Sequence, residues 1–295
     1  MQRTARTPDG RTLAIEEAGD PNGHPVLVHE GTPNSRHLYP PTAIDAAVRG
    51  LRLISYDRPG YGGSTPQPGR TVADCAADVR AICAELGIGR LAMWGISGGG
   101  PHVLACAALL PDLVSAVASL ASLAPLDGDG LDWFAGMGEL NADDTRLFLR
   151  DREAARAKLE ADREEVLEAS PADLAGRLRT LLSPTDAAVL NDGLADFLVY
   201  CEHEGLAPSV EGWWDDGVAH CTPWGFELSA ISVPVLLMHG RQDQFVPFGH
   251  GQWLAAHIPG ARVHLQPGAG HLTMTVTAID AILDELLALS ELPRG

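Results

Sequence analysis

Short apolar runs alternate with polar or amphipathic stretches through the first 125 residues, and the same rhythm returns after residue 228. Apolar runs bounded by turn residues are typical of buried strands, whereas apolar positions three and four residues apart are typical of helices. The runs predict strands over residues 11–18, 25–29, 51–56, 91–94, 114–123, 233–239 and 262–265. The amphipathic stretches predict helices over residues 72–86, 102–110, 250–257 and 277–289. This alternation indicates an α/β fold, in which a doubly wound, mostly parallel sheet is covered by helices on both faces.

The pattern changes between residues 126 and 228, where strand and helix runs no longer alternate. Asn141 begins a long, charged helical stretch, while Ser170-Pro171 and Ser183-Pro184 each have the form of an N-cap followed by proline at the first helical position. The segment holds 23 acidic and 8 basic residues, so it carries −15 of the net charge of −18. We interpret residues 126–228 as a helical insertion between two α/β stretches, residues 1–125 and 229–295.

One motif organises the chain. The apolar run 91–94 ends in Gly95-Ile96-Ser97-Gly98-Gly99, and a helical run follows at once. A G-x-S-x-G between a strand and a helix predicts a tight turn that exposes the serine hydroxyl, with Gly95 and Gly99 where side chains would collide with backbone. The free N–H groups of the following helix point at the same place, which suits a developing negative charge.

Two more chemical groups follow strand runs. Asp243 comes after residues 233–239, and His271 comes after residues 262–265. Parallel strands bring such positions to one edge of the sheet, so we expect Ser97, Asp243 and His271 to meet there. A serine hydroxyl needs a base within hydrogen-bond reach, and the base needs an orienting acid. Asp127 is the alternative acid, because it follows the run 114–123.

These motifs together resemble the α/β-hydrolase superfamily. The resembling pieces are Gly95–Gly99, Asp57–Gly62, His239–Asp243 with Val246-Pro247, and Gly268–His271. The resemblance implies an eight-stranded sheet, a cap inserted after the sixth strand, and a catalytic triad of Ser97, Asp243 and His271. A serine nucleophile separates the chain from the dehalogenases and epoxide hydrolases of that superfamily, which use a carboxylate.

The resemblance also implies an oxyanion hole made of two backbone N–H groups. One belongs to Gly98, and Thr32 is the best candidate for the other. The family commonly has His-Gly in this loop, whereas this chain has His29-Glu30-Gly31. The simplest interpretation places Glu30 in solvent or in an ion pair with Arg36 or Arg58. A role for Glu30 in catalysis or substrate contact is the alternative.

Composition and charge narrow the class of protein. The net charge of −18 argues against nucleic acid, because phosphate contacts need basic patches. The first nine residues lack the apolar core of a secretory signal, and glycines and a proline interrupt the uncharged stretch 91–111, so neither predicts membrane insertion. Five cysteines without a C-x-x-C motif indicate free thiols and a cytoplasmic protein. The eleven histidines show no metal-ligand spacing, so we expect neither a metal nor a cofactor.

The first hypothesis is hydrolysis of a small carboxylic ester or lactone. The same triad could instead cleave an amide or a carbon–carbon bond, and a non-catalytic ligand-binding protein on this fold is the alternative from another class. We expect a neutral, partly apolar small-molecule substrate, because an acidic cap disfavours anions, although a solvated acidic surface explains the charge equally well. The oligomeric state stays open. Candidates for an apolar pocket lining are the cap aromatics Trp133, Phe134, Trp213 and Trp214, although packing in the cap's own core is the simpler interpretation for each.

Overall fold

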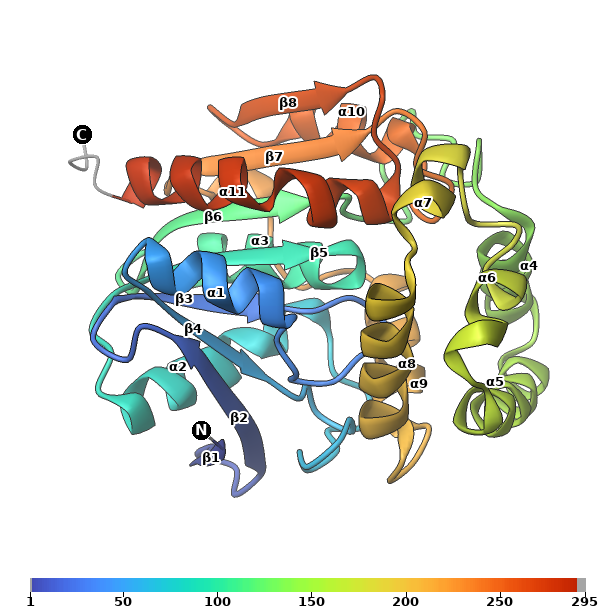
Figure 1. The fold of residues 1–295 in the computed structure, drawn as a ribbon, viewed down its shortest axis with the longest axis horizontal. Helices are drawn as coiled ribbons and strands as arrows, with labels where there is room; N and C mark the ends of the chain where they lie inside the picture. The colour runs from blue at the N-terminus through green and yellow to red at the C-terminus, as the bar shows by residue number, and fades with distance from the viewer. Residues whose placement is uncertain (1, 291–295) are drawn as a thin grey trace.

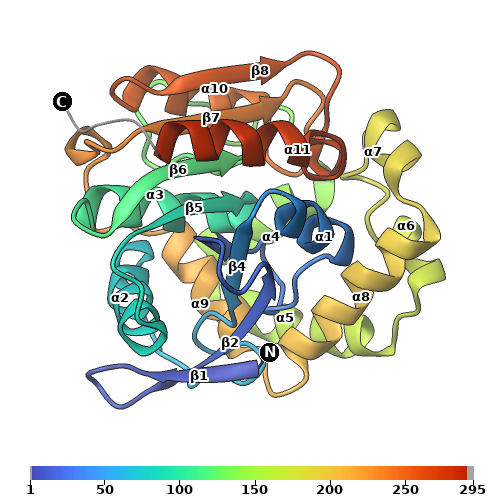
Figure 2. The same cartoon turned by 60° about the vertical axis from the view of Figure 1, so that its left-hand side comes forward.

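The computed structural model describes residues 2–290 and has an eight-stranded sheet at its centre (Figure 1). The strands are β1 (Gln2–Arg6), β2 (Thr12–Gly19), β3 (His24–His29), β4 (Leu51–Tyr56), β5 (Leu91–Ile96), β6 (Val114–Leu120), β7 (Val235–Gly240) and β8 (Arg262–Gln266). Their order is β1-β2-β4-β3-β5-β6-β7-β8. Strand β2 runs antiparallel to β1 and β4, and all other neighbours are parallel. Figure 2 shows β1 and β8 at opposite edges of the sheet. The mostly parallel α/β sheet predicted from the sequence is confirmed.

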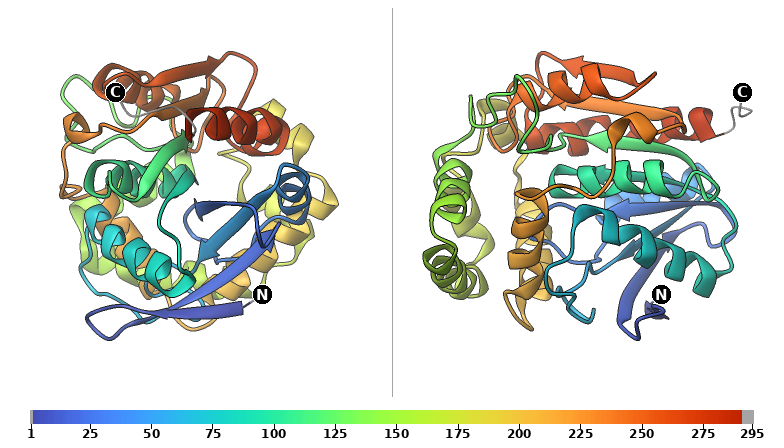
Figure 3. Two further views of the ribbon diagram at one scale, coloured as in Figure 1. Left: turned by 90° about the vertical axis from the view of Figure 1, so that its left-hand side faces the viewer. Right: turned by 180° about the vertical axis from the view of Figure 1, so that it is seen from behind.

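Helices cover both faces of the sheet because alternate strand residues point to opposite sides. On β3, Leu27 packs into the core beneath one set of helices, while Val26 and Val28 pack into the core beneath the other. The first set contains α2 (Cys75–Leu86), α3 (Gly100–Leu109) and α10 (Phe248–His257). The second contains α1 (Pro40–Val48) and α11 (His271–Ser290). The left view of Figure 3 shows the sheet between these two layers.

The stretch between β6 and β7 folds into helices that lie beyond the carboxyl ends of the parallel strands, where the arrowheads point (Figure 1). They are α4 (Glu139–Arg150), α5 (Arg152–Glu168), α6 (Leu174–Arg177), α7 (Pro184–Val189), α8 (Asp192–Leu206) and α9 (Glu211–His220). The single long helix predicted from Asn141 is two helices, because Asp151 caps the second one and accepts a hydrogen bond from the Ala154 N–H at 3.0 Å. Ser183 caps α7 as its sequence predicts.

Helix α11 begins at His271, six residues before the predicted start at residue 277. His271 is therefore the first residue of a helix rather than part of a loop. Helix α11 is the longest of the described helices, yet neither it nor any other helix in residues 2–290 is long and apolar enough to cross a lipid bilayer.

Candidate active site

Ser97 occupies a strained turn between β5 and α3. Its φ of 55° lies in the left-handed region, which is uncommon for a residue with a side chain. The turn leaves no room for side chains at its glycines: a Cβ on Gly95 would lie 2.5 Å from the Gly99 carbonyl oxygen, and one on Gly99 would overlap the His29 carbonyl oxygen. The sharp turn that the sequence motif predicts is therefore enforced by close backbone packing.

Asp243 and His271 form a buried, hydrogen-bonded pair. Nδ1 of His271 donates to Oδ2 of Asp243 at 2.7 Å. The other carboxylate oxygen accepts from the backbone N–H groups of Phe245 at 2.9 Å and Val246 at 2.8 Å, which fixes its orientation. The Phe245 ring stacks on the imidazole, with centroids 4.5 Å apart. The acid bonded to His271 is Asp243 and not Asp127, the alternative considered from the sequence.

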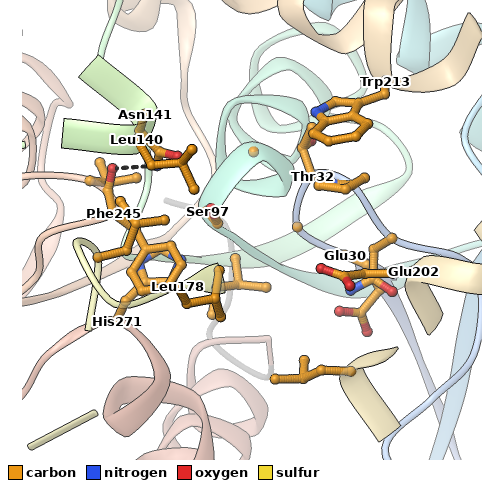
Figure 4. A pocket seen from close by; sticks show the side chains of 18 of the residues that line it. Glu30, Thr32, Ser97, Leu140, Asn141, Leu178, Glu202, Trp213, Phe245 and His271 are labelled. Carbon is orange, nitrogen blue, oxygen red and sulfur yellow. Dashed lines mark hydrogen bonds between the residues drawn. The ribbon is translucent and has the colours of Figure 1, made fainter. Parts of the chain in front are cut away.

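Ser97 and His271 line the same cavity, which has a volume of about 570 Å³ (Figure 4). Among the hydrogen bonds of residues 2–290, none joins the Ser97 hydroxyl to the imidazole. Such contacts are often long in unliganded enzymes and shorten when substrate binds. The side chains brought together here come from the ends of β5, β7 and β8, as the sequence predicted.

Gly98 and Thr32 are neighbours beside Ser97. A Cβ added to Gly98 would lie 2.9 Å from the Thr32 Cβ, and one added to Gly31 would lie 3.6 Å from the Ser97 Cβ. The Thr32 N–H has no acceptor within the described part of the chain. This loop thus presents an unused backbone donor next to the serine.

The Arg58 guanidinium fixes the conformation of the loop formed by residues 30–32. It donates to the carbonyl oxygen of Glu30 at 2.5 Å, to that of Gly31 at 2.7 Å and to Oγ1 of Thr32 at 2.9 Å. Arg58 is buried and is paired at 2.5 Å with the carboxylate of Asp216 on α9. The loop conformation therefore depends on an ion pair with the inserted segment.

Helix α9 touches both backbone segments beside Ser97 through residues one turn apart. Asp216 accepts from Thr32 Oγ1 at 2.6 Å, and His220 Nε2 donates to the Gly98 carbonyl oxygen at 3.0 Å. His102 Nδ1 donates to the same oxygen at 2.9 Å, so this histidine packs against the turn. Burial lowers the pKa of His220 to about 4, which keeps it a neutral donor.

Glu30 is not where the simplest interpretation put it. Its side chain lines the same cavity as Ser97 instead of facing bulk solvent (Figure 4). The expected ion pair is also wrong: Arg36 binds Asp57 at 2.6 Å, and Arg58 binds Asp216. Burial raises the pKa of Glu30 to about 7, against a partial lowering by the charge of Arg58.

Three of the four candidate aromatics, Trp133, Trp213 and Trp214, are among the residues that line the cavity. Phe134 is not among the described lining residues, because its ring packs edge-on against Trp133 and beneath the Arg146 guanidinium. That candidate is therefore wrong. Most of the remaining wall is apolar, with Leu140, Leu178 and Phe197 among its members.

His29, Cys75 and Cys106 offer ligand atoms within 4.8 Å of one another in the core beneath the site. They come from separate segments, so sequence spacing could not reveal them. Burial raises the pKa of Cys75 well above its usual value, which disfavours the thiolate that a metal would need. Neither nitrogen of His29 has a hydrogen-bond partner among the described residues, whereas His239 Nε2 bonds the Val246 carbonyl oxygen at 2.9 Å.

The sequence interpretation missed Asp186 and Asp216. Both are buried carboxylates with hydrogen-bond partners that lie 85 to 184 residues away in the chain. Nothing in their local sequence distinguishes them from the many other acidic residues of the inserted segment. Only the helix start at Ser183-Pro184 gave a signal near Asp186, and it predicted a cap, not a contact with another helix.

Comparison with known proteins finds proteins of similar sequence and structure over nearly the whole chain. The family model of the alpha/beta hydrolase fold matches residues 24–276. A non-heme haloperoxidase from Rhodococcus erythropolis is 26% identical over 307 residues, spanning 96% of this chain and 97% of that protein. A bifunctional esterase/perhydrolase from Acinetobacter calcoaceticus is 26% identical over 293 residues, with coverage of 96% and 97%. The solved structure of a thermophilic esterase from Thermogutta terrifontis has a TM-score of 0.69 at 21% identity, covering 99% of this chain and 100% of that one, and shares the fold.

Proposed function

Because the chain belongs to the α/β-hydrolase fold family and is a hydrolase, we propose that it is a serine hydrolase that cleaves a small carboxylic ester or lactone through an acyl-enzyme on Ser97. One arrangement carries the proposal: an imidazole bonded to a buried carboxylate lines the same cavity as a serine on a strained turn. The esterase named among the relatives is consistent with this reaction class.

The first half-reaction forms a bond between Ser97 Oγ and the carbonyl carbon. His271 takes the hydroxyl proton on Nε2, since its Nδ1–H is committed to Asp243. The bond to the leaving oxygen then breaks, and the proton on Nε2 passes to that oxygen. Asp243 fixes the tautomer and stabilises the imidazolium. Water repeats the sequence in the second half-reaction and releases the acid from Ser97.

The developing oxyanion binds to the backbone N–H groups of Thr32 and Gly98. Support for this role comes from the unused Thr32 donor and from the closeness of both residues to Ser97. Each such donor contributes about 10²- to 10³-fold in rate. Arg58 and helix α9 hold the backbone at Thr32 and at Gly98 in fixed positions relative to each other.

Residues 126–228 act as a cap domain over the catalytic domain formed by 1–125 and 229–295. The apolar cavity wall suits a neutral acyl or alcohol group of modest size.

A panel of p-nitrophenyl esters, combined with fluorophosphonate labelling read by mass spectrometry, tests the proposal. Ester turnover with label on Ser97 supports it. Labelling of Ser97 without ester turnover favours amide or carbon–carbon bond cleavage. Absence of both labelling and ester turnover favours a non-catalytic binding protein. The panel leaves the natural substrate to be found by trapping an acyl adduct on Ser97.

A further inference from the structure

Resting on the serine hydrolase function proposed above, we propose that Glu30 is a recognition site for a protonated amino group on the acyl part of the substrate. The chemical class that fits is an ester whose acyl chain carries an amine close to the scissile carbonyl. The proposal rests on the position of this carboxyl group, on its lack of a protein partner and on the chemistry of its surroundings.

Glu30 and Ser97 line the same cavity from neighbouring segments of the chain. Glu30 directly precedes Gly31, and a Cβ on Gly31 would be in van der Waals contact with the Ser97 side chain. Figure 4 shows the Glu30 side chain in the wall of the cavity that contains Ser97 and His271. An acyl group bound at Ser97 would therefore share its cavity with this carboxyl.

The protein supplies no partner for the Glu30 carboxylate within residues 2–290. Arg58 donates to the backbone carbonyl of Glu30 and not to its carboxyl group, and it is paired with Asp216, which it shares with Arg70. The positive charge of Arg58 lowers the pKa of Glu30 only in part. On α8, Cys201 is a buried thiol and Glu202 is already paired with Arg177 of α6 at 3.0 Å. A partly buried carboxylate without donors is costly to ionise, and this cost raises the pKa of Glu30 to about 7.

A protonated amine provides what the site lacks, namely N–H donors and a positive charge. A substrate carboxylate in the same place would meet a like charge as soon as Glu30 ionises. Preference for the amine should therefore grow as the pH rises through about 7, for as long as the amine itself stays protonated.

The test compares two nearly isosteric esters, β-alanine methyl ester and methyl butanoate, which differ by an ammonium group in place of a methyl group. Methanol release gives kcat/KM for each ester between pH 6 and 8.5. We expect the wild-type ratio of amino ester to neutral ester to rise with pH, and Glu30→Gln to lower it about 10- to 100-fold at pH 8 and to remove its pH dependence.

Glu164→Gln is the matched control, because Glu164 is exposed on α5 and outside the described cavity lining, and its loss changes the net charge equally. It should leave the ratio unchanged. A wild-type ratio that favours the neutral ester, or a Glu30→Gln variant that keeps the wild-type ratio, overturns the proposal. Absence of turnover for both esters, together with an unlabelled Ser97, would instead contradict the hydrolase function.

A separate set of contacts carries a second inference: we infer that Asp186, on α7 of the inserted segment, is a positioning residue for His271. The first N–H groups of a helix lack acceptors within it. At the start of α11, Asp186 provides them from another helix: Oδ2 accepts from the His271 N–H at 3.0 Å, and Oδ1 accepts from the N–H and Oγ1 of Thr273, each at 2.9 Å. Asp186 is fully buried, and a side chain at Gly270 would overlap its carboxylate.

Asp186→Asn replaces one acceptor oxygen by an NH₂ group that would face a backbone N–H. We expect kcat for ester hydrolysis to fall about 10- to 100-fold while KM changes less than about threefold, because His271 is displaced and the cavity wall is kept. Ser183→Ala is the matched variant: it removes the hydroxyl that donates to Asp186 at 2.8 Å and keeps the carboxylate, so its kcat should stay within about threefold of wild type. Thermal unfolding of each variant shows whether it folds. A folded Asp186→Asn with wild-type kcat, or equal losses in both variants, contradicts the inference.

Discussion

Replacing Ser97 by alanine is expected to reduce kcat for p-nitrophenyl ester hydrolysis by about 10⁵- to 10⁶-fold, which leaves only the residual rate that substrate binding and the oxyanion donors supply. The reason is that no acyl-enzyme can form without the hydroxyl, so the His271–Asp243 pair has no nucleophile to activate. The strained backbone of the turn tolerates alanine as well as it tolerates serine, because both side chains begin with the same Cβ. Steady-state kinetics measure the loss, and the fluorophosphonate label should be absent from the variant.

Ser55→Ala is the control for this variant. Ser55 lies on β4, is fully buried, and has a hydroxyl without a partner among the described residues. The Ser55→Ala variant also loses one hydroxyl oxygen, but Ser55 has no role in the site, so its kcat should equal that of the wild type. A Ser97→Ala enzyme that keeps more than about one hundredth of the activity would show that another residue is the nucleophile.

Replacing Asp216 by alanine is expected to lower the free energy of unfolding by about 3–5 kcal/mol. Its carboxylate is the shared partner of two buried guanidinium groups, Arg58 at 2.5 Å and Arg70 at 2.6 Å. The substitution leaves both charges buried without it. Urea unfolding followed by circular dichroism measures the loss. Asp143→Ala removes a carboxylate from an exposed pair with Arg146 and should cost less than about 0.5 kcal/mol.

The effect of Asp216 also has a defined pH dependence. Burial raises the pKa of this carboxyl, but Arg58 and Arg70 outweigh it and hold the pKa well below the usual 3.8. A carboxyl group whose pKa is lower in the folded than in the unfolded protein stabilises the fold at pH values above its unfolded pKa. This stabilisation is lost as the pH falls towards the folded pKa. The difference between wild type and variant should therefore be constant from pH 7 to 5 and shrink below about pH 4. A difference that grows on acidification would contradict the ion pairs.

The sequence predicted those features that depend on local pattern. Seven strands, the turn at Ser97, and the order of Ser97, Asp243 and His271 follow from hydrophobic runs and from residues that come directly after them. Strand β1 was not predicted from its own sequence because its polar residues form an edge strand whose structure comes from pairing with β2.

The features that were missed depend on contacts between distant segments. Helix α11 starts early because Asp186 supplies the acceptors that no residue preceding His271 provides. Glu30 faces the cavity because its two candidate partners, Arg36 and Arg58, are already bound to Asp57 and Asp216. A sequence shows that such charges exist, but the choice of partner is decided by the packing of the whole chain.

The pairing of Asp216 with Arg58 and Arg70 has a consequence for how the molecule is assembled. Removal of α9 would leave the guanidinium groups of Arg58 and Arg70 without their shared carboxylate. The proposed cap is accordingly not a module that can be cut away or exchanged by itself, and it should melt together with the sheet in a single cooperative transition. A chimera that carries a relative's cap would need its own acid at this position before its oxyanion loop could form.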